Sequence, residues 1–393
     1  MNTGNQTFYK WILRETFTAA LLLLLFFATY TPVLAQVQEF EQWQYMKTIT
    51  PEGYVCYRTL GALDIDGRMN EPSWKAAPWT NFFVDIEGSR KPLPRFKTRA
   101  KMLWDNYYFY VGAELEEPHV WGTLVFHDQI ICHENDFEIF IDPNSDNHEY
   151  YEIEIGPLNT IWDLYHITPY KDMTPVTASV QTWDIQGMKT AVFVDGTIND
   201  PRDVDKSWSV EFAIPLTVLA PKANHPSPPQ NGDRWRVNFS RVEYVHDIVT
   251  ADRTNEEEDI KNNAYSKREG IPCDNWVWSP QGVINMHCPE MFGYVQFSTA
   301  EPGTDTFHPD PTLSARVLLH GIYYVQRDFN KKNGRWATSL KELGKEFKLD
   351  AQVVGPPSLT LTEKGYRAGL VVRLPDGKTR TLHISQDSRV EEE

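Results

Sequence analysis

The chain has 393 residues, of which 41% are hydrophobic, 23% charged and 13% aromatic, and its formal net charge is −16. This is the composition of a globular protein, and the length favours two or three folded units. The acidic balance argues against binding to nucleic acid, which needs a basic face, and is compatible with neutral ligands such as sugars and with cation sites.

The N-terminal segment has the pattern of a signal peptide. Lys10 and Arg14 precede the apolar run 19–27, and small residues then lead to Ala35. We expect cleavage after Ala35, so that residues 1–35 are removed and the mature chain is exported to the periplasm, the cell surface or the medium. An uncleaved anchor is the alternative, and no later segment is apolar enough to span a membrane.

The cysteine content fits an oxidising compartment without fixing any pairing. The even number allows disulfides, and three pairings remain open, with free buried thiols as the alternative. No CxxC spacing occurs, which argues against a structural zinc site. The four cysteines are Cys56, Cys132, Cys273 and Cys288.

Residues 36–60 are expected to form an extended N-terminal segment, and short strands separated by turns follow it. Each run alternates apolar and polar residues or is rich in β-branched and aromatic residues, as strands are. This texture predicts a mainly β chain with an antiparallel β-sandwich over residues 61–298. The predicted strands are 99–104, 108–115, 136–141, 150–155, 160–164, 178–183, 190–194, 208–214, 234–244 and 293–298.

A change in residue composition and periodicity separates the C-terminal part from the sandwich. Residues 299–312 contain three prolines, a glycine and several polar residues, which predicts a linker. Residues 313–393 then predict a small α+β domain, large enough to fold alone. Its expected elements are a helix at 313–330, a helical piece at 339–347, and strands at 360–372 and 379–384.

Three stretches of the sandwich carry a resemblance to a known family. The first is LDIDGRMNEPSW at 63–74, and the second is KMLWDNYYFYVGAE at 101–114, followed by NDFEIFIDP at 135–143. The third is WSVEFAIP at 208–215, followed by WRVNFSR at 235–241 and FGYVQF at 292–297. In order and spacing these stretches resemble the family 9 carbohydrate-binding modules.

The resemblance implies a jelly-roll-like β-sandwich that binds calcium and recognises sugars. We therefore expect an exported, non-catalytic protein that binds a poly- or oligosaccharide and takes part in polysaccharide catabolism. Two tryptophans sandwich the sugar in well-studied modules of this kind, but Cys132 and Met286 stand at the matching positions. Trp162 and Trp278 are the expected substitutes among the nearby aromatic residues, because sugars stack on aromatic rings. A core or interface role is the alternative for each of them, because large aromatic residues dominate sandwich cores.

Polar residues on two strands complete the expected sugar site. The resemblance places Glu138 as a sugar-contacting acid. Strand alternation puts this side chain on the face opposite Phe137 and Ile139. Asn238, Ser240 and Arg241 lie on the strand that lines the family's pocket, and Arg241 is suited to bridge Glu138 and a hydroxyl. A salt bridge on the sheet surface is the alternative for this pair.

A candidate calcium loop follows the strand 136–141. Asp142, Asn144 and Asp146 have the i, i+2, i+4 oxygen spacing that calcium loops use, although the full EF-hand loop is absent. Asp-Pro-Asn is also a good turn sequence. Glu152 and Glu154 alternate on the next strand and either complete a cation site or remain solvated.

Two other functions compete with sugar binding. A glycoside hydrolase needs paired carboxylates, which Glu138 with Glu152 or Asp136 would supply. A haem-binding electron-transfer sandwich would use axial ligands such as Met286 or His287. The chain contains no nucleophile elbow, phosphate-binding loop or dinucleotide fingerprint, and the spacing of its histidines matches no metalloenzyme motif.

Overall fold

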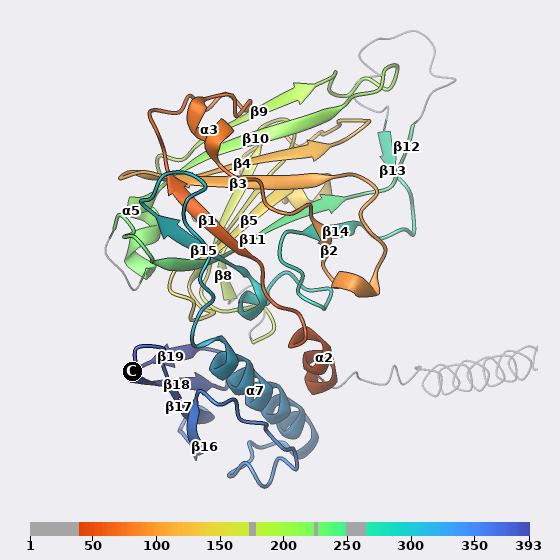
Figure 1. Cartoon of the computed structure of the whole chain (residues 1–393). Helices are drawn as coiled ribbons and strands as arrows, with labels where there is room; N and C mark the ends of the chain where they lie inside the picture. The colour runs from red at the N-terminus through yellow and green to blue at the C-terminus, as the bar shows by residue number, and fades with distance from the viewer. Residues whose placement is uncertain (1–38, 173–177, 224–226, 249–264) are drawn as a thin grey trace, which may run out of the picture. The chain divides into compact units, whose positions relative to one another are not determined.

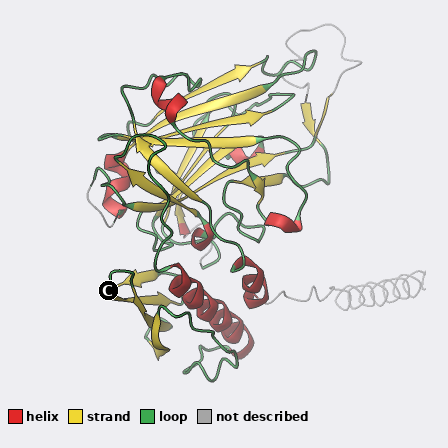
Figure 2. Ribbon diagram, viewed as in Figure 1, coloured by secondary structure: helices red, strands yellow, loops and turns green. Residues whose placement is uncertain are grey.

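Most of the regular structure is β-strand, in one large curled sheet, with a small sheet and a long helix in the C-terminal part (Figures 1 and 2). The computed structural model describes residues 39–172, 178–223, 227–248 and 265–393. The predicted signal peptide, residues 1–35, lies outside the described residues. Among the described helices, none combines the length and the apolar character that crossing a bilayer requires.

The large sheet has 13 strands among the described residues, in the order β8-β7-β6-β5-β11-β15-β1-β3-β4-β10-β9, while β14 pairs with β11 and with β2. Its strands are β1 Gly53–Arg58, β2 Val84–Asp85, β3 Thr98–Trp104, β4 Tyr108–Glu116, β5 Phe137–Asp142, β6 Tyr150–Ile155, β7 Ile161–His166, β8 Ser179–Val180, β9 Lys189–Asp195, β10 Ser207–Pro215, β11 Arg234–Glu243, β14 Asp274–Val277 and β15 Gly293–Ser298.

The remaining elements are shorter or lie in the C-terminal part. Strands β12 His246–Ile248 and β13 Tyr265–Lys267 form a two-stranded sheet, and β16 Val353–Leu361, β17 Tyr366–Arg373, β18 Thr379–Ser385 and β19 Val390–Glu392 form a four-stranded sheet. The described α-helices are α2 Glu39–Met46, α3 Pro72–Ala76, α5 Leu216–Leu219 and α7 Leu313–Asn333.

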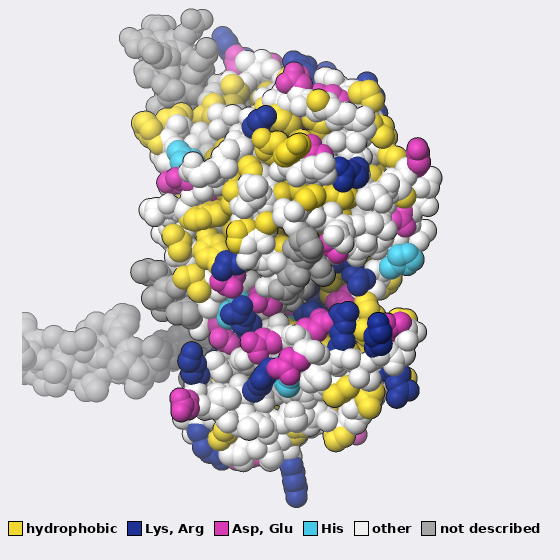
Figure 3. Space-filling model, turned by 90° about the vertical axis from the view of Figure 1, so that its left-hand side faces the viewer, with side chains coloured by type: hydrophobic (Ala, Val, Ile, Leu, Met, Phe, Trp, Pro, Cys, Tyr) yellow, Lys and Arg dark blue, Asp and Glu magenta, His cyan; other side chains and the backbone are white. Residues whose placement is uncertain are grey.

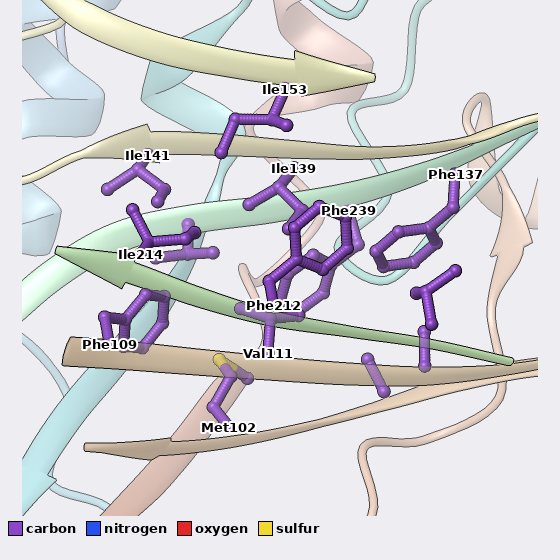
Figure 4. Close-up of a cluster of buried hydrophobic side chains, with 14 of the residues drawn as sticks. Met102, Phe109, Val111, Phe137, Ile139, Ile141, Ile153, Phe212, Ile214 and Phe239 are labelled. Carbon is purple, nitrogen blue, oxygen red and sulfur yellow. The ribbon is translucent and has the colours of Figure 1, made fainter. Parts of the chain in front are cut away.

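One hydrophobic core lies between the two halves of the curled sheet, which confirms the predicted sandwich (Figure 4). Phe137 and Ile139 of β5 point into this core from one half, and Phe212 of β10 comes from the other. The rings of Phe137 and Phe212 are 6.3 Å apart. Period-2 alternation therefore gives each strand one apolar face, and the curl buries both apolar faces together.

The expectation of an extended segment at residues 36–60 is wrong. Residues 39–46 form helix α2, and residues 53–58 form β1, so the sheet begins at Gly53 rather than at residue 61. Strand β1 joins the two halves because it pairs with both β15 and β3. Both pairings are parallel, so the sandwich is mixed rather than purely antiparallel.

The C-terminal part contains helix α7 packed on the four-stranded sheet, as an α+β unit. The predicted helical piece at 339–347 is wrong, because these residues form turns. The single strand expected at 360–372 is two antiparallel strands, β16 and β17, with a turn at 362–365. Trp43 of α2 stacks on Tyr324 of α7, with ring centroids 5.2 Å apart, so the N-terminal helix packs with this part.

Residues 299–312 are not a free linker. Ser298 donates to the Asp305 carboxylate over 2.6 Å, and Tyr57 of β1 donates to the Asp305 carbonyl over 3.1 Å. Arg234 of β11 donates to the carbonyls of His308 and Pro309. The Pro-rich segment therefore runs along the sheet and is held there by hydrogen bonds, a packing that its composition does not reveal.

Candidate functional site

A cavity of about 440 Å³ lies on the outer face of strands β5, β6 and β7. Residues with even numbers on β5 point away from the core, as alternation predicts, yet Glu138 is only 4% exposed. The segments 130–133 and 284–287 also line the cavity and cover this face. The polar and aromatic lining residues include Cys132, His133, Glu138, Glu152, Glu154, Trp162, Tyr170, Tyr244, Asn275, Asn285 and His287.

Carboxyl groups dominate the floor of the cavity. Glu138 lies directly opposite Glu154 across the β5–β6 ladder, and Glu152 is two residues along β6. Burial, and then the charge of Glu152, raise the pKa of Glu138 to about 8. Burial and the neighbouring carboxylates also raise the pKa of Glu154 well above its usual value. Both pKa values are raised because burial excludes water and because neighbouring carboxylates repel one another.

No Lys or Arg occurs among the described residues that line the cavity. On the face drawn in Figure 3, by contrast, Lys and Arg side chains lie among Asp and Glu side chains. Charges on that surface are therefore mixed in sign, whereas the cavity is strongly acidic. Such an arrangement favours hydroxyl-rich or cationic ligands over anionic ones.

Glutamate 152 differs from its neighbours in charge. Burial alone would raise its pKa, but the hydrogen bond with His166 and the charges of His166 and His287 lower it overall. The Glu152 Oε2 and His166 Nε2 atoms are 2.5 Å apart. The cavity thus holds one carboxyl group that keeps its proton up to about pH 8, Glu138, beside one that is ionised, Glu152.

Trp162 is the predicted aromatic residue that reaches the cavity. On β7 it lies opposite Glu154 of β6, is 9% exposed, and packs with Ile131 and Leu164. Tyr170 and Tyr244 also line the cavity. Cys132 and Met286 line it too, so the positions that match the family's two tryptophans do lie at this site.

The predicted role of Arg241 as a bridge to Glu138 is wrong. Alternation along β11 places Arg241 on the core face with Phe239, whereas its neighbour Ser240 lies opposite Glu138. The Arg241 guanidinium binds Glu117 over 2.8 Å and Glu243 over 2.8 Å, and all three side chains are buried. Arg241 is therefore a structural cation at the end of the core.

Two other predicted contacts are also placed elsewhere. Trp278 is a core residue, with its ring 5.7 Å from that of Phe239, so it is not available for stacking on a sugar. Asn238 is fully buried, and its amide exchanges two 2.9 Å hydrogen bonds with the main chain of Ser279. The segment that follows β14 therefore occupies the amide.

The loop predicted to bind calcium is folded as a turn. The two carboxylate oxygens of Asp142 accept the N–H groups of Ser145 and Asn147. Asn144 accepts the N–H of Asp146, whose own carboxylate pairs with Arg389 over 2.9 Å. Main-chain donors and a guanidinium contact these oxygens, as the turn sequence also predicts, and calcium binding by this loop stays a prediction.

Sequence reasoning missed His166 as a member of the site. It is fully buried, and its ring lies 5.0 Å from that of His287, so two imidazoles lie beside Glu152. His166 faces the same side of β7 as Trp162 and Leu164, because alternate residues of a strand point the same way. This alternation could have identified His166 from the sequence. The predicted strand ended at residue 164 and left it out.

All four cysteines are free in the structure, Cys56 and Cys288 being buried. A larger groove, of about 980 Å³, is lined mainly by residues of α2 and α7 and by the segments 309–311 and 346–352. It contains none of the predicted site residues. The β5–β7 cavity is therefore the candidate functional site, since Glu138 and Trp162 both line it.

A known family matches part of the chain. Residues 65–228 match the family model described as carbohydrate family 9 binding domain-like. No curated protein sequence matches the chain. The matched segment includes strands β5, β6 and β7, which supply Glu138 and Trp162 to the cavity.

Three solved structures show a distant similarity. A candidate carbohydrate-binding protein from Bacteroides uniformis has a TM-score of 0.44 and 14% identity, covering 63% of this chain and 100% of its own. A family 9 carbohydrate-binding module from Caldicellulosiruptor kristjanssonii, bound to cellotriose, has a TM-score of 0.38 and 15% identity, covering 65% and 100%. The same module bound to glucose has a TM-score of 0.39 and 18% identity, with the same coverage. The sequence match alone links the chain to a family: residues 65–228 are similar to the family described as carbohydrate family 9 binding domain-like.

Proposed function

We propose that the protein is an exported, non-catalytic carbohydrate-binding protein that recognises a poly- or oligosaccharide in polysaccharide catabolism. One observation carries the proposal: the family-matched segment supplies an acid and an aromatic residue, Glu138 and Trp162, to one cavity. A sugar needs an aromatic ring for its apolar face and fixed polar groups for its hydroxyls, and this cavity offers both.

The cavity fits a small part of a glycan rather than a long chain. Its volume of about 440 Å³ lies at the lower end of the range of roughly 300–1,000 Å³ that is typical of ligand sites. Cys132 and Met286 replace the two tryptophans that sandwich sugars in the modules it resembles, so stacking falls to Trp162 with Tyr170 or Tyr244. Glu138, protonated near neutral pH, can donate a hydrogen bond as well as accept one.

A binding screen with product analysis tests this function. The purified protein is applied to plant and microbial glycans on an array, and the ligands found are then titrated calorimetrically. We expect saturable binding with no release of new reducing ends. Absence of binding to every glycan would contradict the proposal.

The second candidate, a glycoside hydrolase, has one observation in its favour. Glu138 keeps its proton up to about pH 8, whereas Glu152 is ionised, and such a split is the pattern of an acid and its partner carboxylate. Release of oligosaccharides by the wild-type chain, lost in Glu152→Gln, would establish this activity. Binding without release would leave the non-catalytic function.

Export is part of the proposal and rests on the sequence of residues 1–35. The charged start, the apolar run and the small residues before Ala35 support cleavage there. Expression in a bacterial host followed by N-terminal sequencing of the periplasmic protein should give a chain that starts at Gln36. A full-length N-terminus on membrane-bound protein would contradict cleavage.

A further inference from the structure

Two histidines and a glutamate converge at one end of the β5–β7 cavity. Glu152 comes from β6 and His166 from β7, and His287 comes from the segment 284–287 that covers these strands. One ligand atom from each residue lies within 4.8 Å of the other two. We infer that Glu152, His166 and His287 form a binding site for a divalent transition metal ion such as Zn²⁺.

The donor types suit this class of ion. Zinc takes imidazole nitrogen at about 2.0–2.1 Å and carboxylate oxygen at about 2.0–2.2 Å, and sites with three protein ligands keep a position open for water or another ligand. Glu152 Oε2 and His166 Nε2 are 2.5 Å apart, so a small opening of this contact admits the ion. Imidazoles favour zinc, copper or nickel over calcium or magnesium.

Neighbouring groups hold the histidines in place. The hydroxyl of Tyr150 is hydrogen-bonded to His287 Nδ1 over 2.8 Å, which leaves Nε2 of that ring as the second nitrogen. The Tyr150 ring also stacks on His166, with centroids 4.6 Å apart. Metal-binding histidines in general use one ring nitrogen for such an outer contact and the other for the ion.

An unsatisfied carboxylate atom lies in the same cavity. The Oε2 atom of Glu138, which is 4% exposed and lines the cavity, has no hydrogen-bond partner. Buried polar atoms are satisfied in all but a few cases, so each exception asks for a ligand, an ion or water. No Lys or Arg among the described lining residues supplies the positive charge.

The adjacent acids reinforce the demand for a cation. Cys132, Glu138 and Glu154 also bring one ligand atom each within 4.8 Å of one another. These three residues line the same cavity as Glu152. A divalent ion would place positive charge beside the three glutamates, and a metal is the largest local charge in such a site.

A second group of possible ligands provides the control. His127, Asp128, Asp163 and Asp184 also bring ligand atoms within 4.8 Å of one another, but three of the four are exposed. The His127 side chain is 52% exposed, so water competes for it and its ring has no fixed orientation from burial. Removing His127 therefore removes an imidazole without touching the cavity.

The test is calorimetric titration of the chelator-treated protein with Zn²⁺ in the absence of sugar. Wild type and His127→Ala should bind one equivalent, whereas His287→Ala and His166→Gln should show no binding. Tyr150→Phe should weaken binding by about 10–100-fold, since it removes only the outer contact. His287 is partly exposed, so His287→Ala remains informative if His166→Gln fails to fold, and circular dichroism checks both.

Two outcomes would overturn the inference. One is the absence of zinc binding to the wild type, and the other is binding that His127→Ala abolishes while His287→Ala leaves it intact. The inference does not rest on sugar binding. Zinc binding without any glycan ligand would contradict the proposed function alone, and glycan binding without zinc binding would contradict the metal site alone.

Discussion

Arg241 shows how a single buried charge organises one end of the core. Its guanidinium is hydrogen-bonded to Glu117, to Glu243 and to the Thr98 hydroxyl. Burial and the nearby Glu243 raise the pKa of Glu117 to about 8, so Glu117 holds its proton near neutral pH. Because water does not reach these groups, the cluster depends on all three members.

Replacing Arg241 should therefore destabilise the protein strongly. Arg241→Met removes the buried guanidinium from Glu117 and Glu243 and leaves Glu243 only the partly exposed Arg95, at 3.4 Å. We expect the free energy of unfolding to fall by about 3–5 kcal/mol. Urea denaturation at pH 7 measures this. Lys206→Ala is the control, since Lys206 pairs with Asp195 on the surface and should contribute about 0–1 kcal/mol. A loss in Arg241→Met no larger than in the control would contradict the buried cluster.

At the residue scale, the alternation of residues along a strand was the most reliable guide to the direction of side chains. It placed Glu138 on the face opposite Phe137 and Ile139, as observed. The same rule, applied to β11, separates Arg241 from Ser240 and would have removed it from the sugar site. Alternation could not show that covering segments bury that outer face, because they come from residues 130–133 and 284–287.

At the element scale, the N-terminal helix and the first strand are the main departure from expectation. Helix α2 has only eight residues, too short to be stable alone, and it forms because Trp43 and Met46 are buried with α7. Strand β1 pairs in parallel with β15, more than 230 positions further along the chain. Such non-local pairings leave no periodic signal in the segment itself.

The contact of α2 with α7 can be tested at Trp43. This side chain is 2% exposed and stacks on Tyr324. Trp43→Ala should lower the free energy of unfolding by about 3–5 kcal/mol, the usual loss for a large aromatic residue in a core. Trp79→Ala, at a partly exposed tryptophan, is the matched control and should cost less. Equal losses in the two variants would contradict the packing of α2.

The sequence predicted helices and strands in the C-terminal part, but the structure has fewer helices and more strands there than predicted. Helix α7 shows apolar residues at helical spacing, and the prediction at 313–330 is confirmed within three residues of its observed end. Residues 339–347 have a similar spacing, yet they form turns between α7 and β16. A short apolar pattern does not distinguish one helical turn from a series of turns.

At the scale of the whole molecule, buried acids should make stability depend on pH. Glu117 and Glu138 have pKa values of about 8 in the folded protein, well above those of exposed glutamates. From pH 7 to pH 8 the folded state therefore holds more protons than the unfolded state. The free energy of unfolding must then fall as the pH rises through this interval.

The variant Glu117→Gln removes one of the two carboxyl groups with a raised pKa and so measures its contribution. In the presence of a chelator, the wild type should lose stability from pH 7 to pH 8. The variant should show a slope that is smaller by up to about 1.4 kcal/mol per pH unit. Urea denaturation at several pH values measures the slope. Stability that rises over this interval, or an unchanged slope in Glu117→Gln, would contradict the raised pKa.

The sandwich itself followed from the order of short strands and turns, because alternation over many strands leaves few other arrangements. The site followed only in part. Glu138 and Trp162 were placed correctly in one cavity, whereas Trp278 and Arg241 belong to the core. Whether a residue faces the cavity or the core depends on the curl of the sheet and on the covering segments. Both of these depend on contacts between residues far apart in the sequence.

The central claim is that a sugar binds in the cavity on strands β5, β6 and β7. The most direct measurement is calorimetric titration of the best glycan from the screen into wild type, Glu138→Gln, Trp162→Ala and the control Trp79→Ala. We expect the affinity to fall at least tenfold in the two cavity variants and to be unchanged in the control. Unchanged affinity in both cavity variants would show that the sugar binds elsewhere and would contradict the claim.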